Sequence, residues 1–172
     1  WKSIASGDPS CAPSSQIGRM LYCMASIPSF RYAADLFLSH GGGGALTMGQ
    51  GFRLSFKDMS KNPHVHQKPD KPWRIWTCEI DTVMCNRSKR ILRDVGLLDE
   101  KSQNGHVTAL CKGAPLDGNE DWIKNNFCPL GELDILNVDP SLGSTMEVCT
   151  IMKATIRVCK PKVIIQMNSG YM

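Results

Sequence analysis

The sequence lacks any uninterrupted apolar run near the roughly 18 residues that a membrane-spanning helix needs. Its first fifteen residues, WKSIASGDPSCAPSS, contain neither the apolar centre of a signal peptide nor an initiating methionine, which favours release from a longer precursor or polyprotein. It also lacks internal repeats and low-complexity tracts. These absences argue against a membrane protein. They favour one globular domain over residues 1–172, with an irregular arm at 1–13.

The sequence has no C-x-x-C pair among its eight cysteines. An even count could indicate disulfides, but the chain is long and apolar and has no secretion signal, which argues against a framework of disulfides. Cys78, Cys149 and Cys159 fall within apolar, regular segments, where a thiol behaves as a small buried hydrophobic group. We therefore expect reduced thiols and a cytoplasmic protein.

The sequence also has little net charge: 20 basic residues and 16 acidic residues leave a net charge of only +4. This small positive charge indicates a mild preference for anionic partners. Four lysines lie in or beside a polar stretch at 57–72 that contains three prolines and is expected to be a loop. These lysines would either contact phosphates or remain solvated: Lys57, Lys61, Lys68 and Lys71.

The order of apolar runs and helical periodicities predicts an α/β protein. Strands are expected at 31–39, 73–81, 106–113, 133–139 and 162–167, and helices at 14–26, 45–56, 82–98 and 143–161, with a short helix or loop at 115–127. Thr82 and Ser144 are expected to cap two of these helices, and Gly49 and Gly51 to interrupt another. Alternating strands and helices indicate a Rossmann-like, mainly parallel sheet with helices on both faces.

Four consecutive glycines, residues 41–44, follow the first expected strand and open the next helix. In open α/β sheets ligands bind at the carboxyl ends of the strands, where glycine allows backbone amides to approach a ligand closely. The second strand ends in CEID, so Glu79, or else Asp81, would hold ribose hydroxyls unless either residue only caps the following helix. The run lacks the third glycine of G-x-G-x-x-G and a G-K-[ST] loop. It therefore favours S-adenosylmethionine over NAD or ATP.

Two segments resemble the FtsJ-like RNA cap methyltransferases of RNA viruses. ADLFLSHGGGGALT is similar to the first motif of that family, and ELDILNVDPSLGSTMEVCTIMKATIRVCKPKVIIQMNSGYM is similar to its second half. The resemblance covers roughly residues 14–56 and 132–172. It implies a Rossmann-fold methyltransferase that uses S-adenosylmethionine, acts on capped viral RNA, and works in the cytoplasm of a host cell.

The resemblance also implies roles for individual residues. His40, Gly41, Gly43 and Ala45 would surround the methionine end of the cofactor, Glu79 its ribose, and Leu110 or Cys111 its adenine, with Asp139 beside the sulfonium. The family's ribose methylation uses a Lys-Asp-Lys-Glu tetrad. Here Asp139 would be its aspartate, whereas Gln16 and Gln166 stand at the lysine positions and no residue is assigned to the glutamate.

Glutamines at both positions bear on which atom accepts the methyl group. Methylation of a ribose hydroxyl gains from a nearby base, or from a charge that lowers the hydroxyl pKa, whereas guanine N7 already carries a free lone pair. N7 therefore needs alignment and a suitable field only, and it is the favoured acceptor. Ribose 2′-O transfer by an altered site and a silent, cofactor-binding scaffold remain the alternatives.

Three weaker patterns have alternative readings. His64 and His66, with Cys78 and Cys85, have the donor types of a zinc site, but their spacing matches no recognised finger and we expect no metal. Four aromatic residues would either stack on a methylated guanine or pack in the core: Trp73, Trp76, Trp122 and Tyr171. We expect Trp73 and Trp76 to pack. An apolar last strand would be an exposed edge. Either a second copy covers it, or the chain is an excerpt, or residues 1–13 or 102–113 supply further strands; we favour a homodimer.

Overall fold

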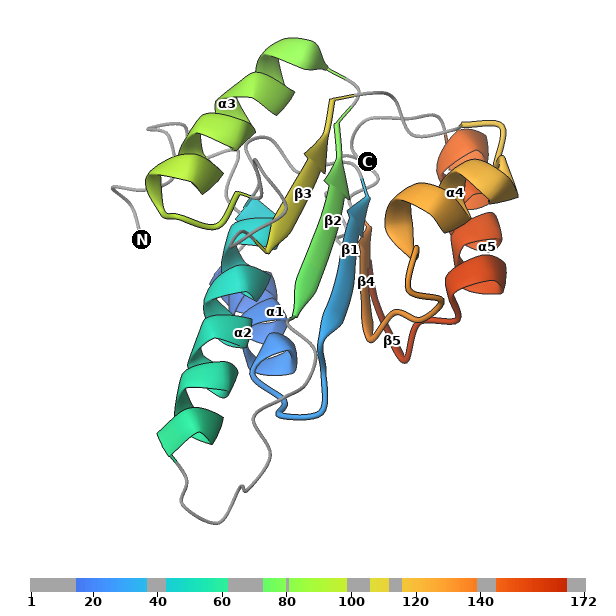
Figure 1. Ribbon diagram of the computed structural model, residues 1–172. Coiled ribbons are helices and arrows are strands. Elements are labelled where there is room, and N and C mark those ends of the chain that lie inside the picture. Colours follow the sequence, from blue (N-terminus) through green and yellow to red (C-terminus); the bar gives the residue numbers. More distant parts are fainter. Residues whose placement is uncertain are drawn as a thin grey trace.

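A computed structural model describes residues 15–36, 43–61, 73–79, 81–98, 106–111, 116–138 and 145–166. They form a parallel five-stranded sheet with helices on both faces (Figure 1). In chain order the elements are α1 (Ser15–Ala25), β1 (Tyr32–Leu36), α2 (Gly43–Lys61), β2 (Arg74–Cys78), α3 (Thr82–Asp94), β3 (Val107–Leu110), α4 (Glu120–Phe127), β4 (Ile135–Val138), α5 (Thr145–Cys159) and β5 (Val163–Gln166). The expected fold class is confirmed.

The sheet order β3-β2-β1-β4-β5 places the first strand at the centre. The chain moves outward from β1 to β2 and β3, then crosses to the other side of β1 for β4 and β5. Because parallel crossovers are right-handed, this reversal puts the two sets of helices on opposite faces. In Figure 1, α1, α2 and α3 lie on one side of the sheet and α4 and α5 on the other. The order reverses between β1 and β4, the point where such sheets bind ligands.

Two apolar clusters fill the layers on either side of the sheet. One joins strand residues such as Ala33, Ile75 and Ile135 to α1 and α2, and the other joins Ala34 and Leu136 to α4 and α5. Their alternation along each strand follows the period of two of a sheet that is covered on both faces. Trp73 and Trp76, one in each cluster, are buried, as predicted for packing side chains.

The glycines of α2 permit a close helix–helix contact rather than interrupting the helix. A Cβ on Gly51 would lie 2.6 Å from the Tyr22 carbonyl oxygen and 2.8 Å from the Ala25 Cβ of α1. A Cβ on Gly49 would meet the methyl tips of Leu97 at 2.9 and 3.1 Å. Helix α2 therefore runs unbroken to Lys61. The expected interruption is wrong, and the first five residues of the expected loop at 57–72 are helical.

Other boundaries and caps differ from the sequence-based expectations in smaller ways. Each described strand is shorter than predicted, and part of the difference, such as residues 37–39 after β1, lies outside the described residues. Helix α3 is capped by Asp81 and not by Thr82: the Asp81 carboxylate accepts hydrogen bonds from the N–H groups of Val83 and Met84. Residues 115–127, left open between helix and loop, contain α4, which Asn119 caps. Ser144 lies outside the described residues.

Asp134 ties the amino ends of the strands together. Its Oδ2 accepts hydrogen bonds from the N–H groups of Arg31 (2.6 Å) and Tyr32 (2.9 Å), and its Oδ1 accepts one from Lys162 Nζ (2.6 Å). The aspartate therefore connects the start of β1 to the segment that enters β5. No helix in the part of the chain that the structure describes is long and apolar enough to cross a membrane.

Candidate functional site at the carboxyl edge of the sheet

A buried carboxylate lies near the carboxyl end of β1, where the strand order reverses. Asp35 is fully buried, and strand register aligns it with Thr77 of β2 and Asn137 of β4. Asn137 Nδ2 donates a hydrogen bond of 2.7 Å to Asp35 Oδ1. The Ala45 N–H in the first turn of α2 donates one of 3.0 Å to Asp35 Oδ2. Both the amide dipole and the positive end of the helix thus compensate a charge that burial alone would disfavour.

Gly44 has a specific steric reason to be glycine. A Cβ at this position would lie 2.6 Å from Asp35 Oδ2 and 2.9 Å from Asn137 Nδ2. Any side chain would therefore displace the carboxylate or push α2 away from the sheet. The glycine run brings the first turn of a helix onto the buried carboxylate, and this accounts for at least one of the four glycines.

The same polar row holds two buried atoms without a hydrogen-bond partner among the described residues. They are Asn137 Oδ1 and Thr77 Oγ1, both on side chains with no exposed surface. Buried polar atoms are normally hydrogen-bonded, so an unpaired one next to a helix N-terminus points to a ligand or an ordered water. The row is thus a group of adjacent buried polar side chains at the edge of the sheet where the strand order reverses.

Glu79 follows β2 at the same edge of the sheet and is 1% exposed. Its Oε1 accepts a hydrogen bond of 3.0 Å from the Asp81 N–H, and its own N–H donates one of 3.0 Å to the Leu110 carbonyl. Asp81, the alternative ribose residue, is engaged as the cap of α3. Glu79 has the buried, fixed carboxylate that the sequence predicted at this strand end, and its role toward ribose stays a prediction.

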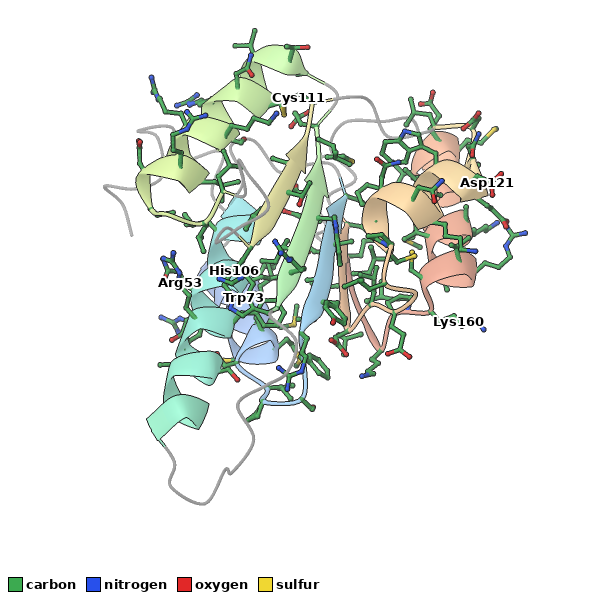
Figure 2. All side chains as sticks on the ribbon, viewed as in Figure 1. Arg53, Trp73, His106, Cys111, Asp121 and Lys160 are labelled. Atoms are coloured by element: carbon green, nitrogen blue, oxygen red, sulfur yellow. A yellow bond between two sulfur atoms is a disulfide. The ribbon has the colours of Figure 1, made fainter. Side chains whose placement is uncertain are left out.

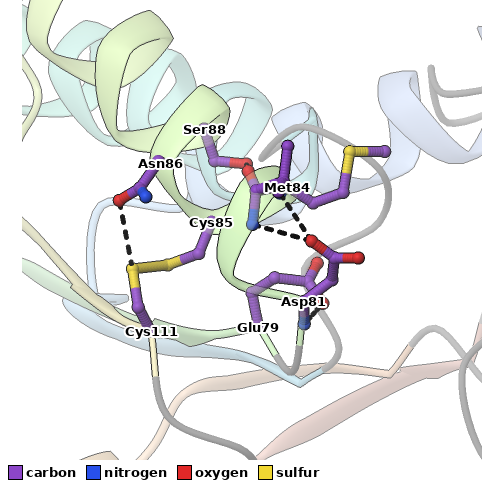
Figure 3. The surroundings of a disulfide bond; sticks show 8 residues. Glu79, Asp81, Met84, Cys85, Asn86, Ser88 and Cys111 are labelled. Carbon is purple, nitrogen blue, oxygen red and sulfur yellow. Dashed lines mark hydrogen bonds between the residues drawn. A yellow bond between two sulfur atoms is a disulfide. The ribbon is translucent and has the colours of Figure 1, made fainter.

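Cys111 forms a disulfide with Cys85 of α3, immediately after β3 ends at Leu110 (Figure 3). The expectation of reduced thiols is therefore wrong for this pair. Sequence spacing hid it, because 26 residues separate the partners and only the fold brings α3 over the end of β3. Asn86 Oδ1 lies 4.0 Å from Cys111 Sγ, a contact without a hydrogen bond because a disulfide sulfur carries no proton. Leu110 and Cys111 stay predictions as neighbours of an adenine.

The remaining cysteines divide between interior and surface. Cys78 and Cys159 are buried, as expected, whereas Cys149 is exposed on the outer side of α5. Successive residues of a helix point in different directions. Cys149 is therefore exposed although it lies within an apolar segment of the sequence. Cys85 is part of the disulfide and is therefore not available as a zinc ligand. His64 and His66 lie outside the described residues.

Several predicted site residues have a known place and others do not. Gly43 and Ala45 lie in the first turn of α2, beside Asp35. Gln16 is exposed in the first turn of α1, and Gln166 is exposed as the last residue of β5. The rest lie outside the described residues: His40, Gly41, Asp139 and Tyr171. The described part of the chain therefore brings together Gly43, Ala45 and the newly identified Asp35–Asn137 pair.

Asp35 and Asn137 were missed by the sequence reasoning, although a signal was available. Each is a polar residue at the centre of an apolar run, YAADL and ILNV, in a strand expected to be buried. A polar side chain in such a strand must find a partner or a ligand.

Two of the aromatic residues considered for cap stacking contact other rings of the protein. Trp122 forms an edge contact with Phe127, and Trp73 stacks on His106 with 4.0 Å between ring centroids (Figure 2).

Solved structures share this fold. An O-methyltransferase from Bacillus cereus in complex with SAH has a TM-score of 0.65 at 17% identity, covering 96% of this chain and 62% of that one. A SAM-dependent methyltransferase from Agrobacterium tumefaciens has 0.56 at 10%, covering 88% and 43%. Cofactor-bound Rv0187 from MTB has 0.55 at 16%, covering 92% and 64%. No protein-family model and no curated protein sequence matches the chain.

These likenesses establish a Rossmann-like fold of the kind found in methyltransferases. The chain spans less than two thirds of the length of each of the three structures. The specific resemblance to viral cap enzymes remains a prediction from the two sequence segments.

Proposed function

We propose that this chain is an S-adenosylmethionine-dependent methyltransferase domain. The observation that carries the proposal is the first turn of α2 seated on the buried Asp35 carboxylate at the point where the strand order reverses. Two of the solved structures with this fold are named methyltransferases, one of them in complex with SAH. The cofactor would supply an electrophilic methyl group when bound.

The residues present fit such a cofactor. The Ala45 N–H is taken by Asp35, whereas the other first-turn N–H groups of α2 lack partners within the helix and favour a carboxylate, such as that of a methionine moiety. Gly44 lets this turn lie directly against Asp35 and Asn137, because a Cβ there would meet both side chains. Asn137 Oδ1, buried and unpaired, is an acceptor suited to an ammonium group or a bound water. The Glu79 carboxylate, fixed by the Asp81 N–H, is suited to ribose hydroxyls.

Guanine N7 of an RNA cap is the acceptor that we propose. Support comes from the glutamines at the two positions where the viral family has lysines, since amides accept and donate hydrogen bonds but take up no proton at neutral pH. An acceptor with a free lone pair requires only alignment with the methyl group. A hydroxyl acceptor is the second candidate, favoured by the fold likeness to an O-methyltransferase.

Cofactor binding and acceptor choice are tested separately. Calorimetry with S-adenosylhomocysteine should show saturable binding to the protein. Gly43→Trp should abolish it, because Gly43 begins α2 and an indole there would cover the first-turn amides. Leu54→Trp is the matched control, on a partly exposed position of the same helix. Absence of binding to the unsubstituted protein would contradict the proposal.

Transfer of a labelled methyl group to two short RNAs then identifies the acceptor. One RNA carries an unmethylated guanosine cap and the other a cap already methylated at N7. Label on the first alone supports N7 transfer. Label on the second shows hydroxyl chemistry and refutes N7. Binding without transfer to either RNA refutes the cap assignment and favours a silent scaffold.

A further inference from the structure

The Cys85–Cys111 disulfide closes a ring of bonds around the end of β2. Cys111 follows Leu110, whose carbonyl accepts a hydrogen bond from the Glu79 N–H at 3.0 Å. On the other side, the Cys85 N–H donates to the Asp81 carbonyl at 2.8 Å, and the Asp81 N–H donates to Glu79 Oε1 at 3.0 Å. The disulfide links Cys85 back to Cys111. The Glu79 carboxylate therefore lies on a closed path of covalent and hydrogen bonds. Figure 3 shows the disulfide together with Glu79 and Asp81.

Without the disulfide, this path depends on a helix with few other anchors near its start. The first residues of α3, from Thr82 to Met84, are exposed or half-buried, and Val83 is 75% exposed. Cys85 is the first buried residue of the helix. The disulfide thus fixes the first turn of α3 against the end of β3, and with it the turn at Asp81 that orients Glu79.

We propose that Cys85–Cys111 is a positioning disulfide that holds the Glu79 carboxylate in register for a ligand's vicinal hydroxyls. Reduction by a dithiol opens the ring: two electrons and two protons pass to the cysteine sulfurs, and the dithiol leaves as its own disulfide. The covalent link between α3 and β3 is then lost. The proposal rests on the proposed function, because it takes the hydroxyls to be those of the cofactor ribose.

A purely stabilising disulfide and a positioning one predict different ligand behaviour. If the bond only stabilises the fold, its loss weakens all ligands of this site alike. If it positions Glu79, its loss removes the contribution of the ribose hydroxyls specifically. A hydrogen bond to a charged group corresponds to roughly tenfold or more in affinity, so the difference is measurable.

The experiment measures the affinities of S-adenosylhomocysteine and of its 2′,3′-dideoxy analogue by calorimetry, in the oxidised protein and in Cys85→Ser. The oxidised protein should prefer S-adenosylhomocysteine by about tenfold or more. In Cys85→Ser, and in the unsubstituted protein after reduction, the preference should fall to about twofold or less. Reoxidation of the reduced protein should restore it. Retention of the full preference after reduction would overturn the proposal.

Cys149→Ser is the matched control, because this thiol is free and exposed. It should leave the preference unchanged; loss of the preference in this variant would contradict the assignment to Cys85–Cys111. Amide hydrogen exchange gives a readout that needs no ligand. The N–H groups of Asp81 and Cys85 should exchange faster after reduction, and unchanged exchange would overturn the proposal. Absence of S-adenosylhomocysteine binding to the oxidised protein would instead refute the proposed function, while exchange would still test the ring of bonds.

Discussion

Gly44 shows how one missing side chain sets the geometry of the candidate site. The Asp35 carboxylate is buried, held by Asn137 and by the Ala45 N–H, and lies where a Cβ on Gly44 would be. The sequence predicted that the glycines allow a close approach. The group that the first turn of α2 approaches is the Asp35 carboxylate, ten residues before Ala45 in the sequence. The two come together only because α2 folds back over β1.

We expect Gly44→Ala to lower the free energy of unfolding by about 1 to 3 kcal/mol, the usual range for overpacking a filled interior. The variant should also bind S-adenosylhomocysteine at least tenfold more weakly, because the first turn of α2 must shift. Denaturant unfolding and calorimetry measure the two effects. A variant with unchanged stability and affinity would show that the contact with Asp35 is not tight in solution.

Gly49→Ala is the control on the same helix. Its Cβ would meet only the methyl tips of the Leu97 side chain, which can rotate. Replacing a helical glycine by alanine gains up to about 1 kcal/mol. We therefore expect a net change within about 1 kcal/mol and undiminished ligand affinity.

At the scale of the elements, α1 and α2 pack backbone to backbone through Gly51. Ala25 of α1 is fully buried, and the Tyr22 carbonyl faces the position of the absent Cβ. The Cβ of an alanine at residue 51 would press on main-chain atoms, which cannot rotate away as a methyl tip does. Sequence reasoning treats a glycine inside a helix as a weakness, since propensity measures the helix alone. The packing of a second helix against it is a tertiary property.

We expect Gly51→Ala to lower the free energy of unfolding by about 1 to 3 kcal/mol, because α1 must move away from α2. Its affinity for S-adenosylhomocysteine should stay within twofold of the unsubstituted protein at a temperature where both are folded. This separates it from Gly44→Ala, which alters the site itself. Equal loss of stability in Gly49→Ala would contradict the argument from backbone contact.

The order of elements was readable from the sequence, whereas their contacts were not. Apolar runs and helical periods depend on neighbouring residues, so YAADL, RIWTC and VIIQ identified their strands. The Cys85–Cys111 pairing and the Asp35–Asn137 hydrogen bond join residues 26 and 102 positions apart. No local pattern encodes such separations. The sequence therefore predicted a site at the carboxyl edge of the sheet and missed the buried Asp35 carboxylate that the structure places there.

For the whole molecule, folding keeps several titratable groups in their neutral or paired forms. Burial raises the pKa of the Cys159 thiol, and a hydrogen bond with Cys128 adds to this effect. Burial also raises the pKa of Tyr32 from its usual 10.0. A hydrogen bond to Asp134 raises the pKa of Lys162 from its usual 10.5. All three shifts stabilise the folded protein below the unfolded-state pKa of each group and lose this contribution as the pH rises.

As the pH rises, the Cys159 thiol should be the first of the three groups to lower the free energy of unfolding, because its ordinary pKa of 9.0 is the lowest. Above about pH 9 the unfolded chain releases a proton that the folded chain retains, so the free energy of unfolding falls by up to about 1.4 kcal/mol per pH unit. Cys159→Ala should be less stable at pH 7, since it leaves a small cavity, but should show a shallower decline between about pH 9 and 10. Denaturant titrations at successive pH values measure both slopes. Identical slopes for Cys159→Ala and the unsubstituted protein would contradict the retention of the proton on the buried thiol.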